Sequence, residues 1–211
     1  MPKHMLVTLP DHDITTYYLR AWGKKAVKYA EDHSIEVTSL DRDKANRKNV
    51  ESYLSNLPFG MVFLNGHGDE NTVQGYNNEP IIIAGKNESK LKSTITYAIS
   101  CSSAMNLGDA SIKAGAICYV GYAQDFMFTL DESNSTHPLE DKLAGLFLEH
   151  TNIFMSAIAK GSSVSEAYDK AKGSLRESIM VAESSGNRTI LSWLLWDYYA
   201  FVAKGDISSR L

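Results

Sequence analysis

The stretches Phe63-Leu64-Asn65-Gly66-His67-Gly68 and Ile99-Ser100-Cys101-Ser102-Ser103-Ala104 decide the fold of this 211-residue chain. Each begins as the end of an apolar run, which predicts a buried strand, and then turns abruptly to small and polar residues. In open parallel sheets, ligands bind at the carboxyl ends of the strands. If these two strands are neighbours, His67 and Cys101 face the same crevice.

A histidine and a cysteine in one crevice are typical of nucleophilic catalysis by a thiolate. A thiol becomes a strong nucleophile as the thiolate, and a nearby imidazole can take its proton. Glycines on both sides of His67 let the backbone approach a substrate closely. The backbone amides of Gly68 and Cys101 are then expected to donate hydrogen bonds to an oxyanion. Either motif alone is more often a turn or a small buried cysteine, but the two together favour a His67/Cys101 dyad.

The rest of the chain alternates apolar runs with helical patterns, which predicts an α/β fold with a mostly parallel central sheet and helices on both faces. Its length fits a single domain over residues 1–211. Strands are expected at 5–9, 35–40, 60–64, 95–100, 116–122 and 196–203, a hairpin at 71–84, a loop at 126–138, and helices at 14–33, 47–57, 106–114, 138–159 and 163–183.

Composition excludes several classes of function. The net charge is −4 with both signs interspersed, so neither nucleic acid nor a membrane surface is an expected partner. No apolar run is long enough for a transmembrane helix, and the first residues do not read as a signal peptide. Two cysteines, Cys101 and Cys118, fit a reducing cytoplasmic setting rather than a disulfide framework. No cofactor is expected, and no metal site, because His67 and Cys101 lack paired ligand spacing.

Both motifs, followed by Gly115-Ala116-Ile117-Cys118-Tyr119-Val120-Gly121, resemble those of the caspase-like cysteine peptidase superfamily, clan CD. The likeness is greatest to the gingipain and CHAT-domain branch, which the segments 159–167 and 196–206 also resemble. It implies a caspase-like three-layer sandwich. It also implies His67 as general base and acid, Cys101 as nucleophile, and the amides of Gly68 and Cys101 as oxyanion hole. Cys118 is then a core residue of the following strand.

The resemblance also bears on substrate choice. In the family, the P1 pocket draws on the loop after the first strand and on the loop after the strand that follows the cysteine. Here those loops hold Asp11, Asp13 and Asp125. A carboxylate on the pocket floor would favour an Arg or Lys side chain. Asp125 is the better candidate because it directly follows a core strand.

Three functions stay open. The first is a cysteine endopeptidase acting on a peptide or protein substrate, with cleavage after Arg or Lys. The alternative is a catalytically silent or partner-activated caspase-like domain that works through a regulatory protein. The third, a flavodoxin-like binding domain, is disfavoured because Pro10-Asp11-His12-Asp13 would repel a phosphate. The aromatic residues Trp193, Trp196, Tyr198 and Tyr199 are expected in core packing rather than in a substrate groove.

Overall fold

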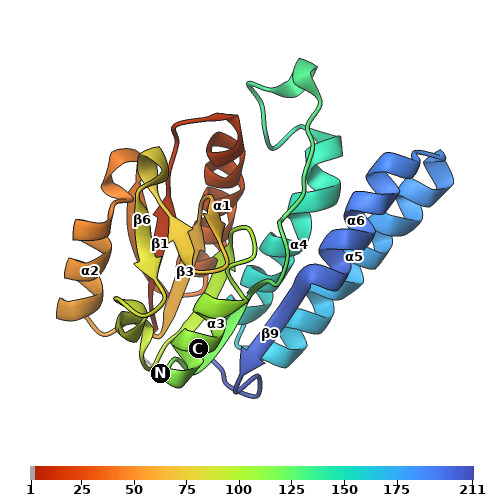
Figure 1. Cartoon of the computed structure of the whole chain (residues 1–211). Helices are drawn as coiled ribbons and strands as arrows, with labels where there is room; N and C mark the ends of the chain where they lie inside the picture. The colour runs from red at the N-terminus through yellow and green to blue at the C-terminus, as the bar shows by residue number, and fades with distance from the viewer. Residues whose placement is uncertain (1–2) are drawn as a thin grey trace.

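The architecture is built on one twisted, mostly parallel sheet (Figure 1). The computed structural model describes residues 3–211. Six strands lie in the order β2-β1-β3-β7-β8-β9, and all neighbouring pairs are parallel except β8 with β9. These strands are β1 (His4–Leu9), β2 (Glu36–Asp41), β3 (Met61–Asn65), β7 (Ile95–Ile99), β8 (Cys118–Tyr122) and β9 (Phe201–Gly205).

The two central strands β3 and β7 are buried along their whole length, as their continuous apolar sequences predict. Their register runs from Met61 opposite Ile95 to Asn65 opposite Ile99. The two strands therefore end level with each other. The residues that follow them leave the sheet side by side.

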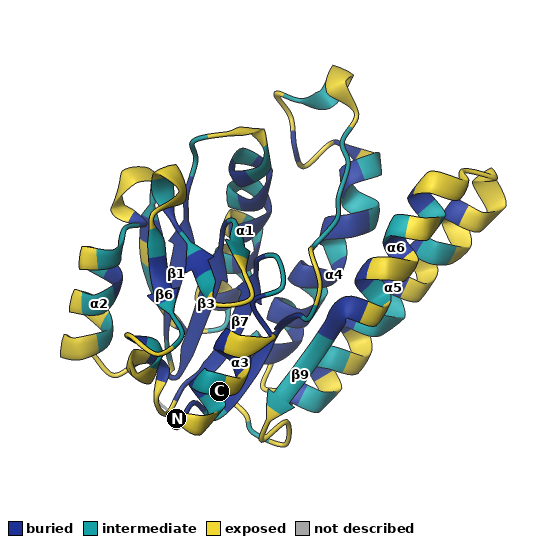
Figure 2. Cartoon of the chain, viewed as in Figure 1, coloured by how far each residue is buried: buried dark blue, intermediate teal, exposed yellow. Residues whose placement is uncertain are grey.

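Helices cover both faces of the sheet, and the result is a three-layer sandwich. One face packs against α1 (Ile14–Asp32), α4 (Lys142–Ala159), α5 (Val164–Ser185) and α6 (Arg188–Ala200). The other face packs against α2 (Arg47–Asn56), α3 (Asn106–Lys113) and a small sheet of β4 (Gly68–Asp69), β5 (Thr72–Gln74) and β6 (Pro80–Ile83). Figure 2 shows the strands buried between these layers, with exposed residues on the outer helix surfaces.

Several local expectations are confirmed by the capping groups. Asp13 caps α1 and forms a capping box with Thr16, so the helix starts directly after the loop that follows β1. The predicted box of Ser163 with Glu166 starts α5. The hairpin expected at 71–84 is the antiparallel pair β5 and β6. Helix α4 begins four residues later than Pro138, because Asp141 caps it at Lys142.

The strand expected at 196–203 is wrong in its first half. Residues 196–200 belong to α6, and β9 begins only at Phe201. The aromatic content favours a strand, but buried residues recur at Ile190, Leu194 and Asp197, which is the spacing of a helix. The same change exposes two aromatic side chains that were expected in the core, Trp196 at 47% and Tyr199 at 76% exposed.

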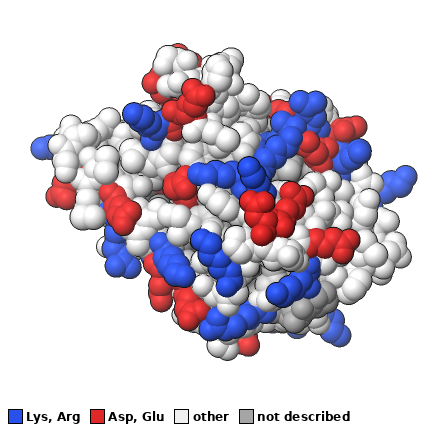
Figure 3. Space-filling model, turned by 180° about the vertical axis from the view of Figure 1, so that it is seen from behind, with Lys and Arg blue, Asp and Glu red and all other residues white. Residues whose placement is uncertain are grey.

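The surface carries charges of both signs. The face in Figure 3 shows Lys and Arg interleaved with Asp and Glu rather than a field of one sign. Across residues 3–211, no helix has both the length and the apolar character that crossing a membrane requires.

Candidate functional site

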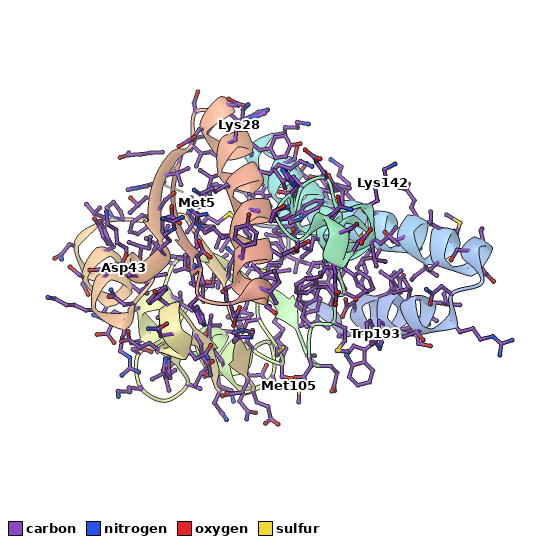
Figure 4. All side chains as sticks on the ribbon, turned by 90° about the horizontal axis from the view of Figure 1, so that it is seen from above. Met5, Lys28, Asp43, Met105, Lys142 and Trp193 are labelled. Carbon is purple, nitrogen blue, oxygen red and sulfur yellow. The ribbon has the colours of Figure 1, made fainter. Side chains whose placement is uncertain are left out.

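Four of the loops that leave the sheet at the carboxyl ends of its parallel strands carry the candidate site residues. In the order of the strands in the sheet, β1 leads to Asp13, β3 to His67, β7 to Cys101 and β8 to Asp125. Figure 4 views the molecule from above. Asp43, which follows the edge strand β2, and Trp193 on α6 lie on opposite sides of this view. Open α/β sheets place their ligand sites at the carboxyl ends of their parallel strands.

The loops that carry His67 and Cys101 touch directly. The Ser100 hydroxyl donates a hydrogen bond to the carbonyl of His67 at 2.9 Å, and the Gly66 amide donates to the carbonyl of Ile99 at 3.2 Å. A Cβ atom on Gly68 would collide with the Ser100 hydroxyl and with the Thr72 carbonyl. Glycine at position 68 is therefore required for the close approach of the two loops.

The ring of His67 is held by a carboxylate. Its Nε2 lies 2.7 Å from Oδ2 of Asp13. The other oxygen of Asp13 accepts the backbone N–H of Thr16 at 2.8 Å, so the helix cap fixes the carboxylate. Burial raises the pKa of Asp13, but the hydrogen bonds from Thr16 and His67 outweigh it and the net pKa is lowered. Sequence reasoning placed Asp13 in a substrate pocket, whereas the structure places it against His67.

Cys101 follows β7 and is half-buried beneath the loop after β8. Its Sγ lies 3.9 Å from the carbonyl oxygen of Phe126. Burial raises the pKa of the Cys101 thiol, and the nearby Asp125 carboxylate acts in the same direction. Both effects disfavour the thiolate form of Cys101. Cys118 lies fully buried within β8, in the core position that was expected, and burial raises its pKa to about 12.

His67 and Cys101 come from adjacent strands, yet in residues 3–211 no hydrogen bond joins the two side chains. His67 contacts Asp13 and the thiol contacts Phe126. Contacts between catalytic groups are often long in unliganded enzymes and tighten only with substrate.

The three acidic residues assigned to a substrate pocket have different surroundings. Asp11 lies 3.6 Å from Arg20 and 3.3 Å from Arg42, so its charge is already paired. Asp125 accepts the Ser102 hydroxyl at 2.9 Å. Within the part of the chain that the structure describes, no Lys or Arg pairs with Asp125.

An apolar groove of about 510 Å³ adjoins the loop after β8. The loop and α6 are joined by the Trp196 indole, which donates to the Asp125 carbonyl at 2.8 Å. The Gln124 carbonyl in turn accepts the amide of Ser102, so a residue that lines the groove is bonded to the Cys101 loop. Its main lining side chains are Gln124, Leu195, Trp196 and Tyr199.

Sequence reasoning missed a buried carboxyl group near the thiol. Asp197 on α6 is 0% exposed and accepts the backbone N–H of Met127 at 2.9 Å. Burial raises its pKa to about 8, so it is largely protonated at neutral pH. Asp197 lies within an aromatic run that was predicted to be a strand, and its burial was therefore not expected. Helical spacing from Ile190 and Leu194 was the signal that could have revealed its inward face.

No family model and no curated protein matches the sequence. Among solved structures, the crystal structure of the Arg-specific cysteine proteinase gingipain R superposes with a TM-score of 0.65 at 9% identity, over 99% of this chain and 47% of that one. The complex of the pro- and mature domains of Porphyromonas gingivalis RgpB gives 0.64 at 7% identity, over 99% and 48%.

The chain has the caspase-like fold. The separase–securin complex of Saccharomyces cerevisiae is also similar, with a TM-score of 0.50 and 14% identity over 96% of this chain and 11% of that one. The caspase-like sandwich predicted from the His-Gly and Cys motifs is thereby confirmed. The chain spans about half the length of the gingipain chains that it matches.

Proposed function

We propose that this protein is a cysteine endopeptidase in which His67 and Cys101 form the catalytic dyad. The observation that carries the proposal is the contact between the two loops, in which Ser100 bonds the His67 carbonyl at the shared edge of the sheet. Two of the structures with a similar fold are of one protein, RgpB, which is an Arg-specific cysteine proteinase by its printed name. Because fold alone does not determine activity, the proposal is based on the residues of the site.

The proposed reaction has two stages. His67 takes the proton of the Cys101 thiol, and the sulfur attacks the scissile carbonyl carbon to give a tetrahedral oxyanion. When this collapses, the C–N bond breaks and His67 gives its proton to the leaving amine. Water then attacks the thioester with His67 as base, the C–S bond breaks, and the thiol regains its proton as the new carboxyl group leaves.

Asp13 acts as the positioning residue for His67. Because the imidazole Nε2 faces the Asp13 carboxylate at 2.7 Å, this nitrogen carries the hydrogen and Nδ1 is left with the lone pair. A carboxylate that fixes the tautomer in this way also stabilises the imidazolium that forms during the reaction.

The oxyanion would be stabilised by backbone amides. Among the described residues, the Cys101 amide donates to no other residue, so it is free to bond a developing negative charge. The amide of Gly68 is proposed as the second donor. Losing one such donor typically lowers the rate by roughly 10²–10³.

For specificity we propose a basic P1 residue. Asp125 supports this choice because its carboxylate lies near the thiol and has no cationic partner within residues 3–211. The groove at Trp196 and Tyr199 continues from the same loop and would take an apolar side chain of the substrate.

The second candidate is a partner-activated domain. The observations that favour it are the raised pKa of the Cys101 thiol and the loop at Phe126 that lies over the sulfur. A partner that moved this loop would uncover the thiol and bring it under the influence of His67. Two of the similar structures are complexes, one with a pro-domain and one with securin.

The test is hydrolysis of fluorogenic peptides that carry Arg, Lys, Leu or Asp at P1. We expect cleavage after Arg and Lys, and a loss of at least roughly 10³-fold in Cys101→Ala and His67→Ala. Asp125→Asn should reduce the preference for basic P1 residues while cleavage continues. Activity that persists in Cys101→Ala would overturn the dyad. A profile with no basic preference would overturn the role of Asp125 alone.

A further inference from the structure

A cluster of nitrogen and oxygen ligands lies beside the proposed dyad. We propose that His12, Asp13 and His67 form a binding site for a transition-metal ion of the Zn²⁺ type, and that an ion bound there switches off His67 as a base. The metal site stands on its own geometry. Its effect on catalysis rests on the proposed function.

The three side chains already converge. Nε2 of His67 lies 2.7 Å and Nε2 of His12 lies 3.6 Å from the same oxygen of Asp13, and one ligand atom from each residue lies within 4.8 Å of the others. Zinc binds such ligands at about 2.0–2.1 Å in a tetrahedron, which separates neighbouring ligand atoms by roughly 3.3 Å. Only small movements would place all three around one ion.

The cluster is held in place by its surroundings. The free oxygen of Asp13 is directed at the histidines because its other oxygen caps α1 through Thr16. The Thr16 hydroxyl also accepts the backbone amide of His12 at 3.0 Å. The His12 side chain is only 8% exposed, and its ring packs edge-on to Tyr76 with 5.6 Å between centroids. Little conformational freedom is left for these ligands to lose on binding.

A further ligand is within reach. Oδ1 of Asn78 lies 3.0 Å from Nε2 of His12. Asn78 stands in the turn between β5 and β6 with a left-handed backbone, φ 58°. An amide oxygen or a water molecule would complete four-coordination. Two imidazoles with one carboxylate suit zinc and its transition-metal neighbours, whereas Ca²⁺ and Mg²⁺ take sets made of oxygen ligands.

The prediction that the chain has no metal site was based on His67 and Cys101 alone. The ligands that the fold brings together instead come from the loop after β1 and the loop after β3, which are neighbours in the sheet. His12 and Asp13 are far from His67 in sequence, so no short ligand spacing could have indicated this set.

The effect on catalysis follows from the tautomer of His67. Without metal, the Nε2 hydrogen points to Asp13 and Nδ1 has the lone pair that takes the thiol proton. A metal ion bound at Nε2 displaces that hydrogen, and a neutral imidazole then carries its hydrogen on Nδ1. Nδ1 can no longer accept a proton from Cys101. The bound ion therefore removes the base without touching the sulfur.

The test is calorimetric titration of ZnCl₂ into the full chain and into Cys101→Ala. We expect one zinc ion per chain in both, and at least a tenfold weaker affinity in His12→Asn. His137→Asn, in the exposed loop before α4, is the matched control and should bind like the parent chain. Asp13→Asn is a second ligand variant that keeps a helix cap. Binding that is lost in Cys101→Ala but kept in His12→Asn would overturn the site, as would no binding.

A second readout separates the site from the reaction. CoCl₂ should give the visible absorption of a tetrahedral nitrogen and oxygen site, without the sulfur-to-cobalt band that Cys101 would add. Zinc should inhibit peptide cleavage in the parent chain and much less in His12→Asn, measured for each variant as the ratio of rates with and without zinc. A chain that binds the ion through these residues but cleaves no peptide would retain the site and refute the proposed function.

Discussion

Asp13 shows what a single residue contributes here and what its sequence position hides. The sequence predicts that it lies in a loop at the edge of the sheet, and it does. The sequence does not predict its contact with His67, because that contact depends on which two strands are neighbours and on which oxygen the helix cap uses. The placement of His67 and Cys101 after two core strands was predictable from local sequence, since the apolar run of each strand is clear.

The variant Asp13→Asn should separate the effect of the carboxylate charge on His67 from the effect of the cap on helix α1. Asparagine caps a helix about as well as aspartate, so the free energy of unfolding should change little, whereas Asp13→Ala should lose about 1 kcal/mol. Both variants remove the carboxylate from His67. We expect kcat/KM for peptide cleavage to fall roughly 10²–10⁴-fold in both. Urea unfolding and peptide kinetics measure the two effects.

A parent-like kcat/KM in Asp13→Asn would contradict the positioning role. Equal stabilities of the Asn and Ala variants would show that the cap contributes nothing. Since the two variants differ in the cap but share the loss of charge, the two conclusions are independent.

At the scale of elements, hydrophobic runs predicted the strands well because β3 and β7 are buried on both faces and leave no ambiguity. The error at α6 has a physical cause. Its exposed face carries large aromatic side chains beside the groove, so it lacks the polar face that normally marks an amphipathic helix. The short strand β4, which holds Gly68, depends on contact with another loop and had no pattern of its own.

Gly68→Ala should disturb the contact between β4 and the Cys101 loop. The added methyl group meets the Ser100 hydroxyl and the Thr72 carbonyl, so we expect a loss of about 1–3 kcal/mol in the free energy of unfolding. Peptide cleavage should fall as well, because Gly68 adjoins His67.

Gly173→Ala is the matched control in α5. A Cβ at this position meets nothing within 4 Å, so the variant should gain about 0.5–1 kcal/mol through helix propensity. Urea titration of both variants measures the changes. A Gly68→Ala protein as stable and active as the parent would show that the two loops are not closely packed.

At the scale of the whole molecule, one tightly packed core joins α1, α4, α5 and α6 to the sheet and encloses polar groups that sequence patterns do not reveal. Asp197 is one. Tyr122 and His150 form another pair, in which the hydroxyl bonds the imidazole, and burial lowers the pKa of His150 to about 3. These groups are buried only because helices distant in sequence close over them, so their titration depends on the complete fold.

The pH dependence of stability should reveal Asp197. Its folded pKa of about 8 lies above the ordinary value of 3.8, so the native state holds a proton that the unfolded state releases. This contribution to stability is present below about pH 4 and is lost as the pH rises to about 8. Relative to Asp197→Asn, the parent should therefore lose free energy of unfolding between pH 5 and pH 8, by roughly a few kcal/mol.

Urea titrations of both proteins at several pH values measure that difference. Subtracting the variant removes the separate titration of His150, which both proteins share. A difference that stays constant from pH 5 to pH 8 would show that Asp197 is ionised in the native state.

The most direct test of the central claim is labelling with a peptidyl-arginine acyloxymethyl ketone, followed by mapping of the adduct by mass spectrometry. The proposed dyad predicts a rapid, single adduct on Cys101 that disappears in His67→Ala, with Cys118 unmodified in the folded chain because it is fully buried. Slow labelling of Cys101 and Cys118 at equal rates, unaffected by His67→Ala, would contradict it.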